Sequence, residues 1–540
     1  MRSLIILAAA LLALAASVRA LQIEAVWSST YDKKLWISDV TSQYSKSART
    51  FVDAADRSSS AQAPNVYPAS NQRLQEFHGW GVGITDATSI VLQGVRQQNE
   101  TLYWELLRLL FDPSEEYIAK GGAGCTLTRT PLSATDFSIA EYTYDDTSDG
   151  SPDPTFENFN ISAAPMTWTT LQDITTVSNG RVKHFFAPWS QPAWMKTGQS
   201  NGPNGLHGGT IQPQYYSLYA KYLTKILMAL GEMGIQAYRL SLQNEPKYAP
   251  TAYPGTIIES DDAADIGDLV RAEFDSNGFE DVGLLALDHN WDLQEYPIDV
   301  FNRSKAFTGV AWHCYGGSPS GQQPFNLAYP DAEVYFTECT RITQWFNEPW
   351  QNLKTQGQVL TVGSINYKSQ SVILWNAVLN ATADRFTGPT LPGVCTNCLA
   401  PIEILPDGSY ELTSDFATLA HGSLATRVRG METQSFVMGV NTTAGQLLAQ
   451  GFENPLGNGM SRFSLVFLQQ NDHYGTGLFE NFTATIQFRG QVVDIELPVG
   501  MHTLWWHAPT HQEPLWRHQQ DRQHQQHRQH QQKGQHRHIR

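Results

Sequence analysis

The stretch Tyr238-Arg239-Leu240-Ser241-Leu242-Gln243-Asn244-Glu245-Pro246 is a short apolar run that ends in a carboxylate. A second run, Val334-Tyr335-Phe336-Thr337-Glu338-Cys339, ends in the same way. A carboxylate is too costly to bury among such residues unless it is paired or used chemically. Two carboxyls that close separate strands are typical of glycosidases, which need one protonated and one ionised carboxyl beside a glycosidic bond.

Eight β-rich runs, each followed by a connection, succeed one another along the middle of the chain. Several connections carry apolar residues at helical spacing, as residues 219–230 do. Eight strand-and-crossover units predict an α/β fold, a (β/α)8 TIM barrel, with its active site at the C-terminal strand ends. Glu245 and Glu338 close the fourth and seventh runs. The runs are residues 77–86, 125–133, 182–190, 235–245, 282–289, 307–315, 332–339 and 371–378.

The sequence on either side of these runs is different. Residues 401–508 hold short alternating runs separated by Asn and Gly, which predict an all-β sandwich of strands and turns without helices. Residues 21–70 contain one clear strand candidate, at 34–40, which we expect to join that sandwich. The expected domains are therefore an N-terminal segment at 21–70, a catalytic barrel at 71–400 and a C-terminal sandwich at 401–508.

The two ends of the chain are expected to lie outside these domains. An apolar run at residues 4–16 follows Arg2, and Val18-Arg19-Ala20 resembles a cleavage site, so residues 1–20 are predicted to be a secretory signal peptide. Residues 509–540 are rich in Gln, His and Arg, which predicts a disordered tail. We expect a secreted protein, and its glycosylation sequons agree with export. They begin at Asn99, Asn160, Asn302, Asn380, Asn441 and Asn481.

The formal net charge of −16 argues against nucleic acid or an anionic membrane as the partner, because like charges repel. A neutral polymer such as a β-glucan meets no such repulsion. No run after the signal is long enough to span a membrane, so we expect no stable membrane insertion. The pattern of cysteines matches no zinc site, and we predict a monomer that uses no metal and no cofactor.

The five cysteines allow two disulfides. Cys395-Thr396-Asn397-Cys398 is interpreted as a local disulfide rather than a redox motif, because Pro392-Gly393 before it favours no helix start. Cys314 and Cys339 can bridge if their strands are neighbours, which leaves Cys125 free.

A set of motifs in a fixed order carries a further signal. They are Phe77-His78-Gly79-Trp80-Gly81, Thr128-Arg129-Thr130-Pro131 with Asp136-Phe137-Ser138, Ala187-Pro188-Trp189-Ser190, Gln243-Asn244-Glu245-Pro246, Trp312-His313-Cys314-Tyr315, Phe336-Thr337-Glu338-Cys339 and Trp375-Asn376. Together they resemble glycoside hydrolase family 30 over residues 77–376. That resemblance implies a retaining β-glycosidase.

The family includes lysosomal glucosylceramidase and secreted fungal endo-β-1,6-glucanases. The segments 312–315, 335–339 and 391–398 look like the glucanase subgroup, whereas the animal glucosylceramidases carry Trp in place of Cys314 and Asp in place of Leu374. The resemblance therefore implies an endo-β-1,6-glucanase acting on β-glucan. The alternatives are a glucosylceramidase, another exo-β-glucosidase or a xylanase. From another class, a carbohydrate-binding protein that has lost catalysis is the rival.

The resemblance also implies a role for each carboxyl. Glu338 is expected to be the nucleophile, kept ionised by Tyr315 and by the charge of Arg129. Glu245 is expected to be the general acid/base, with a pKa raised by its surroundings and by the neighbouring carboxylate. The two carboxyls are expected about 5–5.5 Å apart, and the pH optimum is expected to be acidic.

The remaining site residues are expected to bind the sugar. By resemblance, Asn244 bonds the 2-hydroxyl and Asp86 holds the distal hydroxyls. Trp189 and Trp375 are expected to shape the sugar pocket, although core packing is a rival explanation for both. His313 is expected either to contact substrate or to be a buried histidine of the core.

Overall fold

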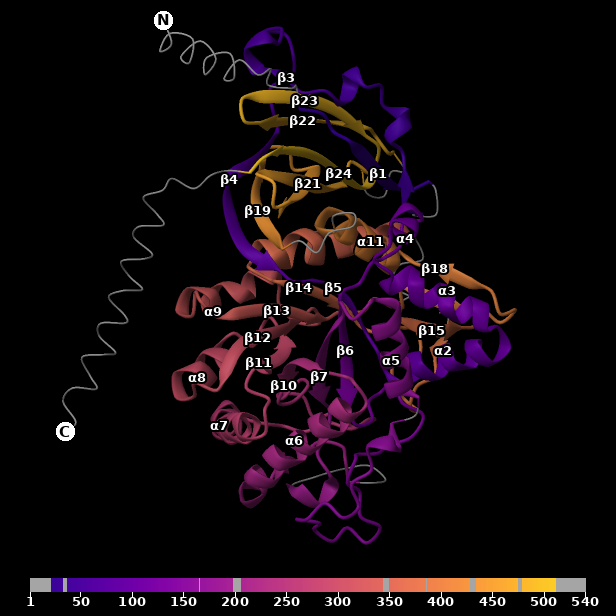
Figure 1. Cartoon of the computed structure of the whole chain (residues 1–540), viewed down its shortest axis with the longest axis vertical. Helices are drawn as coiled ribbons and strands as arrows, with labels where there is room; N and C mark the ends of the chain where they lie inside the picture. The colour runs from indigo at the N-terminus through magenta and orange to yellow at the C-terminus, as the bar shows by residue number, and fades with distance from the viewer. Residues whose placement is uncertain are drawn as a thin grey trace, which may run out of the picture.

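A computed structural model gives the structure of the chain and describes residues 21–32, 36–164, 166–197, 205–342, 349–384, 386–427, 434–473 and 478–510. The predicted signal peptide and residues 511–540 of the predicted tail lie outside the described residues. Two bodies are visible in Figure 1, a barrel and a β-sheet unit above it. No helix within the described ranges combines the length and apolar character needed to cross a membrane.

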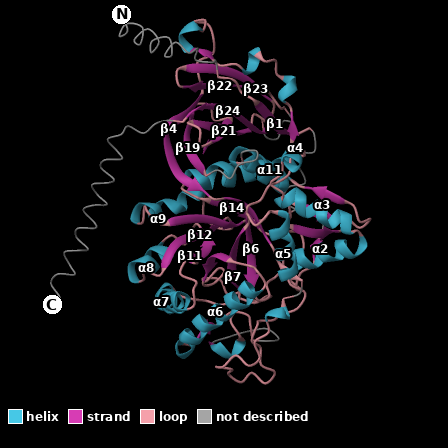
Figure 2. Ribbon diagram, in the orientation of Figure 1, coloured by secondary structure: helices cyan, strands magenta, loops and turns pink. Residues whose placement is uncertain are grey.

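The eight predicted runs form a closed barrel of parallel strands, so the predicted (β/α)8 fold is confirmed. The strands follow one another around the barrel in sequence order, and helices surround them (Figure 2). The strands are β5 (Gly79–Gly83), β6 (Leu127–Leu132), β7 (Lys183–Pro188), β10 (Ala237–Ser241), β11 (Gly283–Asn290), β12 (Phe307–His313), β13 (Glu333–Glu338) and β14 (Ser371–Leu374). The helices between them are α2 (Asp86–Gln98), α3 (Glu100–Phe111), α4 (Glu115–Ala119), α5 (Thr167–Val177), α6 (Tyr216–Glu232), α7 (Ser260–Ser276), α8 (Glu295–Arg303), α9 (Gln323–Ala328) and α10 (Pro349–Gln356).

Side chains fill the inside of the barrel. One cluster takes a residue from each of six strands: Leu127, Phe185, Leu285, Ala311, Tyr335 and Ile373. These buried side chains exclude water from the interior, as in other barrels of this class. A ligand can therefore meet the barrel only at one of its ends.

The second body is a ten-stranded sheet built from both ends of the chain. Strand β1 pairs antiparallel with β24, with Ala25 opposite Trp505. The sheet folds back on itself, because Phe488 of β22 packs on Phe463 of β21 and Trp506 of β24, with ring centroids 4.9 Å and 5.0 Å away. The predicted sandwich is thus confirmed. Its strands are β1 (Ala25–Thr30), β2 (Ser38–Asp39), β3 (Val52–Asp53), β4 (Val66–Phe77), β19 (Ser435–Thr442), β20 (Leu447–Pro455), β21 (Met460–Gln469), β22 (Phe482–Phe488), β23 (Gln491–Leu497) and β24 (Gly500–Pro509).

One helix contradicts the expectation that residues 401–508 contain only strands and turns. Helix α11 (Ser414–Thr426) is buried along its whole length and lies between the barrel and the sheet (Figure 1). His421 contacts Thr503 of β24, and Thr426 accepts a hydrogen bond from the Trp80 indole of β5. A helix covered on all sides needs no polar face, so its sequence lacks the periodicity that reveals surface helices.

A small sheet follows the barrel and joins it to α11. Its strands are β15 (Val378–Ala381), β16 (Thr387–Gly388), β17 (Ile402–Ile404) and β18 (Tyr410–Leu412). Both predicted disulfides are confirmed, Cys314–Cys339 and Cys395–Cys398, and Cys125 is a buried free thiol.

Candidate active site

A cleft of about 620 Å³ lies where the barrel strands end. Every barrel strand runs in the same direction, so the residues just past each C-terminus gather around one opening. Six of the nine predicted site residues line the cleft. Among all the residues that line the cleft are Asp136, Trp189, Asn244, Glu245, Glu338 and Trp375.

The two predicted carboxyls face each other in this cleft. Glu338 is the last residue of β13, whereas Glu245 lies in the turn after β10, which ends at Ser241. An oxygen of each glutamate and a ring nitrogen of His313 all lie within 4.8 Å of one another. The Glu245 backbone is left-handed, with φ of 46°, and its N–H donates to Asp288 O at 3.0 Å. Such a costly conformation in a non-glycine residue is typical of functional sites.

Arg129, from β6, joins the groups of three other strands. Its Nη1 donates to Glu338 Oε2 at 2.6 Å, and its Nη2 donates to Asn244 Oδ1 at 2.7 Å and to Asp288 Oδ2 at 2.8 Å. Since Asn244 uses its oxygen in this way, its amide nitrogen is the group that can donate to a ligand. Tyr315 donates to the other oxygen of Glu338, at 2.9 Å. Both oxygens of Glu338 are therefore held by donors.

The two predicted tryptophans form one wall of the cleft. The rings of Trp189 and Trp375 are stacked, with centroids 5.2 Å apart and planes 19° apart. The Arg129 guanidinium lies 5.0 Å from the Trp189 ring and 5.8 Å from the Trp375 ring. The two rings thus pack against the Arg129 guanidinium, and they also line the cleft.

Asp288 is a site residue that the sequence analysis did not identify. It is fully buried at the end of β11 and accepts from Arg129, from Thr337 Oγ1 at 2.7 Å and from His313 Nε2 at 3.0 Å. Burial opposes its charge, but Arg129 and His313 hold its pKa far below the usual value. Asp288 is therefore ionised and can stabilise a positive charge on His313.

His313 is buried and bridges two carboxyls. Its Nδ1 lies 3.1 Å from Glu245 Oε1, opposite the Nε2 contact with Asp288. Burial lowers the pKa of His313, but the charge of Glu338 and the hydrogen bonds to Asp288 and Glu245 outweigh it and raise the pKa to about 9. His313 is therefore an imidazolium at neutral pH. It contacts Glu245 and has no exposed surface that a sugar could reach.

The pKa values of the two glutamates shift in the directions opposite to those expected. Burial raises the pKa of Glu245, but the hydrogen bond from His313 and its charge outweigh burial, so the pKa is lowered. Burial raises the pKa of Glu338, and the charge of Glu245 adds to it, although His313 and Arg129 oppose it. The expected directions were wrong because no pattern in the sequence indicated a charged imidazole beside Glu245. Glu245 must therefore receive a proton before it can act as an acid.

Asp86 is not among the residues that line this cleft, and its predicted hold on the distal hydroxyls of the sugar stays a prediction. It is the first residue of α2, and its carboxylate accepts from Ser138, Tyr142 and Thr167 at 2.6–3.1 Å. The oxygens of the Asp86 carboxylate thus already accept hydrogen bonds from hydroxyls of the protein. Asp136 lines the cleft instead, and burial together with the charges of Glu338 and Glu245 raises its pKa to about 8. Its motif was recognised in the sequence, but no role was assigned to it.

Glu245, His313 and Glu338 are also residue types that bind metals. Both ring nitrogens of His313 and both oxygens of Glu338 already have protein partners, and a guanidinium nitrogen lies 2.6 Å from Glu338. A cation placed there would be repelled by Arg129. Hydrogen bonding therefore accounts for this cluster better than metal binding does.

The sequence of this chain is similar to those of known proteins. A family model described as "Glycosyl hydrolase family 30 TIM-barrel domain" matches residues 77–348. An endo-1,6-beta-D-glucanase (neg1) of Aspergillus fumigatus is 28% identical over 374 residues, which span 66% of this chain and 72% of that protein. The lysosomal acid glucosylceramidase of Mus musculus is 29% identical over 258 residues, 45% of this chain and 47% of that protein.

A solved structure supports the fold. The endo-beta1,6-glucanase BT3312 superposes with a TM-score of 0.71 and 21% sequence identity. The superposition covers 89% of this chain and 99% of that chain. It therefore extends beyond the barrel to the sheet body.

Proposed function

The chain belongs to glycosyl hydrolase family 30 and is a β-glycosidase, and from this premise we propose that it is a secreted endo-β-1,6-glucanase that works by double displacement. The spacing of Glu245 and Glu338 carries the proposal, since their oxygens approach within 4.8 Å. Retaining glycosidases hold their carboxyls about 5–5.5 Å apart, whereas inverting ones need about 6.5–9.5 Å to admit a water molecule. The observed spacing supports retention.

In the first step, Glu338 attacks the anomeric carbon and forms a glycosyl ester, while the bond to the leaving oxygen breaks. The contacts from Arg129 and Tyr315 support this role, because they orient the carboxylate and stabilise its charge. Glu245 gives a proton to the leaving oxygen. In the second step, Glu245 takes a proton from water, which attacks the anomeric carbon and releases Glu338.

His313 is the nearest source of the proton that Glu245 gives away. Its Nδ1 is 3.1 Å from Glu245 Oε1, so a proton can move between them along one hydrogen bond. That transfer leaves a neutral imidazole and a neutral carboxyl, and Asp288 keeps the ring in place through Nε2. The proton returns to His313 when Glu245 deprotonates the attacking water.

The cleft offers both polar groups and aromatic rings to the sugar next to the nucleophile. Asn244 offers an amide nitrogen beside Glu245, and Asp136 offers a carboxyl that is protonated below pH about 8. Trp189 and Trp375 supply flat faces. Tyr248, three residues after Glu245 and 49% exposed, also lines the cleft. An exposed aromatic ring there suits a further sugar of a polymer.

β-1,6-Glucan is the proposed substrate because the relative named as an endo-1,6-beta-D-glucanase aligns over more of this chain than the glucosylceramidase does. Secretion is proposed from the N-terminal apolar run and from the two disulfides, which persist in oxidising compartments. Glycosylation of the sequons and a monomeric state belong to the same proposal.

Product analysis tests this function. The purified chain is incubated with β-1,6-glucan, glucosylceramide and xylan, with Glu338→Gln as the inactive control. Oligosaccharides of mixed length from β-1,6-glucan are expected, with the β-anomer formed first by NMR. Glucose alone, or ceramide release, would favour an exo-glucosidase or a glucosylceramidase. Binding to every β-glucan without turnover would identify a carbohydrate-binding protein instead.

A further inference from the structure

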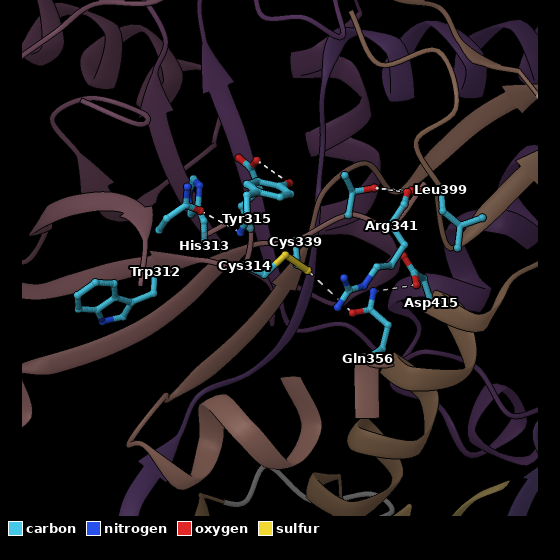
Figure 3. Close-up of a disulfide and its surroundings, with 12 residues drawn as sticks. Trp312, His313, Cys314, Tyr315, Cys339, Arg341, Gln356, Leu399 and Asp415 are labelled. Carbon is cyan, nitrogen blue, oxygen red and sulfur yellow. Dashed lines mark hydrogen bonds between the residues drawn. A yellow bond between two sulfur atoms is a disulfide. The ribbon is translucent and has the colours of Figure 1, made fainter. Parts of the chain in front are cut away.

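A disulfide joins the residues that directly follow the two strands bearing the central groups of the site. Cys314 comes after His313, the last residue of β12, and Cys339 comes after Glu338, the last residue of β13. Their Cα atoms are 5.3 Å apart. Figure 3 shows this disulfide with Tyr315 on one side and Gln356 on the other. Tyr315, the neighbour of Cys314, is the tyrosine that donates to Glu338.

The disulfide lies where the pairing of β12 and β13 ends. Trp312 pairs with Phe336, and then the register shifts so that His313 pairs with Glu338. Cys314 and Cys339 are the next residues in the shifted register. A covalent bond therefore continues the connection between the strands at the point where the ladder of backbone hydrogen bonds stops.

The two halves of the disulfide have different surroundings. Cys339 is fully buried and packs beside Gln356 of α10, whose Nε2 donates to Asp415 of α11 at 2.9 Å. Cys314 is only partly buried and leads into a loop. Tyr315 in this loop is 45% exposed, and its backbone N–H donates to Asn290 Oδ1 at 2.9 Å. The buried half can thus anchor the exposed half.

We propose that the Cys314–Cys339 disulfide is a positioning device that holds the Tyr315 hydroxyl on Oε1 of Glu338. The inference rests on the proposed role of Glu338 as nucleophile. Arg129 holds the other oxygen, so the bond from Tyr315 fixes the rotation of the carboxylate about its side chain. A displacement of the ring by about 1 Å is enough to lose that alignment and slow attack on the anomeric carbon.

Covalent labelling of Glu338 by an activated 2-fluoro β-glucoside measures this alignment directly. The variant Cys314→Ala/Cys339→Ala is expected to be labelled about tenfold or more slowly, with nearly unchanged affinity for the reagent, because one charge-assisted hydrogen bond is lost. In the Tyr315→Phe background, the same two substitutions are expected to change the rate no further. A normal labelling rate, or losses that multiply in the two backgrounds, would overturn the inference.

The second disulfide supplies the matched control. Cys395→Ala/Cys398→Ala also removes one disulfide, and its effect on labelling is expected to be the same with Tyr315 or with phenylalanine in its place. If Cys314→Ala/Cys339→Ala does not fold, the folded wild type and Tyr315→Phe are reduced with dithiothreitol and alkylated. Mass spectrometry then verifies that Cys314 has reacted, circular dichroism verifies the fold, and the labelling rates are compared in the same way.

The proposed function and the positioning role of the disulfide can be overturned separately. A wild-type chain that is neither labelled nor active on any β-glucoside would overturn the proposed function, and this inference with it. A wild type that is labelled at Glu338, beside a disulfide variant that is labelled equally fast, would overturn only the positioning role.

Discussion

Nη1 of Arg129 lies 2.6 Å from Oε2 of Glu338, although 209 residues separate them in the chain. The same guanidinium contacts Asn244 and Asp288, so one buried side chain draws four strand ends together. A buried cation with several carboxylate partners is stable only while those partners remain in place. The geometry of the site therefore depends on all of these residues together.

Replacing Glu338 by Gln is expected to lower kcat by at least about 10³-fold, because an amide cannot form the glycosyl ester. The amide oxygen can still accept from Arg129, so the fold should persist. Glu333→Gln is the matched control, since Glu333 begins the same strand and bonds Arg239 at the opposite end of the barrel. Steady-state rates on β-1,6-glucan check the prediction, and a Glu338→Gln variant with normal rates would refute the assignment.

Replacing Glu245 by Gln is expected to slow hydrolysis of β-1,6-glucan by about 10²–10⁴-fold, because the leaving oxygen loses its acid. A dinitrophenyl β-glucoside needs no such acid, so formation of its glycosyl ester should be nearly spared. Added azide should restore turnover and give the β-glucosyl azide, which NMR identifies. Equal losses on both substrates would contradict the acid/base role.

Asp136 and Asp86 are expected to respond in opposite ways to substitution by alanine. Asp136→Ala should lower kcat/KM about 100-fold through lost hydrogen bonds to the sugar, without lowering the free energy of unfolding near neutral pH. Its raised pKa, about 8, means that the folded state disfavours its charge above the usual pKa of 3.8. Asp86→Ala should cost about 1–3 kcal/mol of unfolding free energy, because three buried hydroxyls lose their acceptor.

Urea titrations and kinetics on both variants decide between these roles. Stable, inactive Asp86→Ala protein together with unstable, active Asp136→Ala protein would reverse the assignment.

His313→Asn is expected to move the alkaline limb of kcat/KM to lower pH, because the variant loses the imidazolium, with a pKa of about 9, that supplies the proton to Glu245. The protonated imidazole also stabilises the fold. Its pKa is raised from 6.5 to about 9, so the stabilisation is fully present below pH 6.5 and is lost as the pH rises through about 9. The difference in unfolding free energy between wild type and variant should therefore shrink from pH 6 to pH 9.5.

Both readouts of His313→Asn are needed, namely pH–rate profiles and urea titrations at several pH values. A variant whose alkaline limb stays in place would show that His313 does not tune Glu245.

Gly422→Ala is expected to destabilise the protein by about 1–3 kcal/mol, because the added Cβ would lie 2.2 Å from the Trp80 ring. Gly94→Ala is the matched control inside another helix, α2, where an added Cβ meets nothing within 4 Å. That change should stabilise the fold by about 0.5–1 kcal/mol. Thermal unfolding measures both, and equal effects would show that α11 does not pack tightly on the barrel.

Much of the barrel could be predicted because its strands are continuous apolar runs that close in polar residues. This pattern located all eight strands, including β10 and β13. Helix α11 was missed for the converse reason. Its residues, from Ser414 to Thr426, are buried on every side, so small and polar residues such as Gly422 and His421 appear without any period. Contacts with Trp80 and Thr503 decide its position, and these partners are remote in sequence.

The positions of Glu245 and Glu338 at strand ends were predictable for the same reason as the strands. Asp288 carried the same signal, since it closes the apolar residues of β11, and it could have been found in that way. The pKa directions could not be found, because they depend on the 3.1 Å contact between His313 and Glu245, which are 68 residues apart in the chain. The distinction between Asp86 and Asp136 also needed coordinates. Both follow recognisable motifs, and only one of them faces the cleft.

The pairing of β1 with β24 constrains how the polypeptide matures during translation. Ala25 leaves the ribosome long before its partner Trp505, which lies 480 residues later in the chain. The barrel is encoded between them, so its strands can assemble while β1 still presents unpaired N–H and C=O groups. A nascent chain stalled before β24 would thus contain a folded barrel and an unpaired edge of β1. Such an edge is a binding site for chaperones.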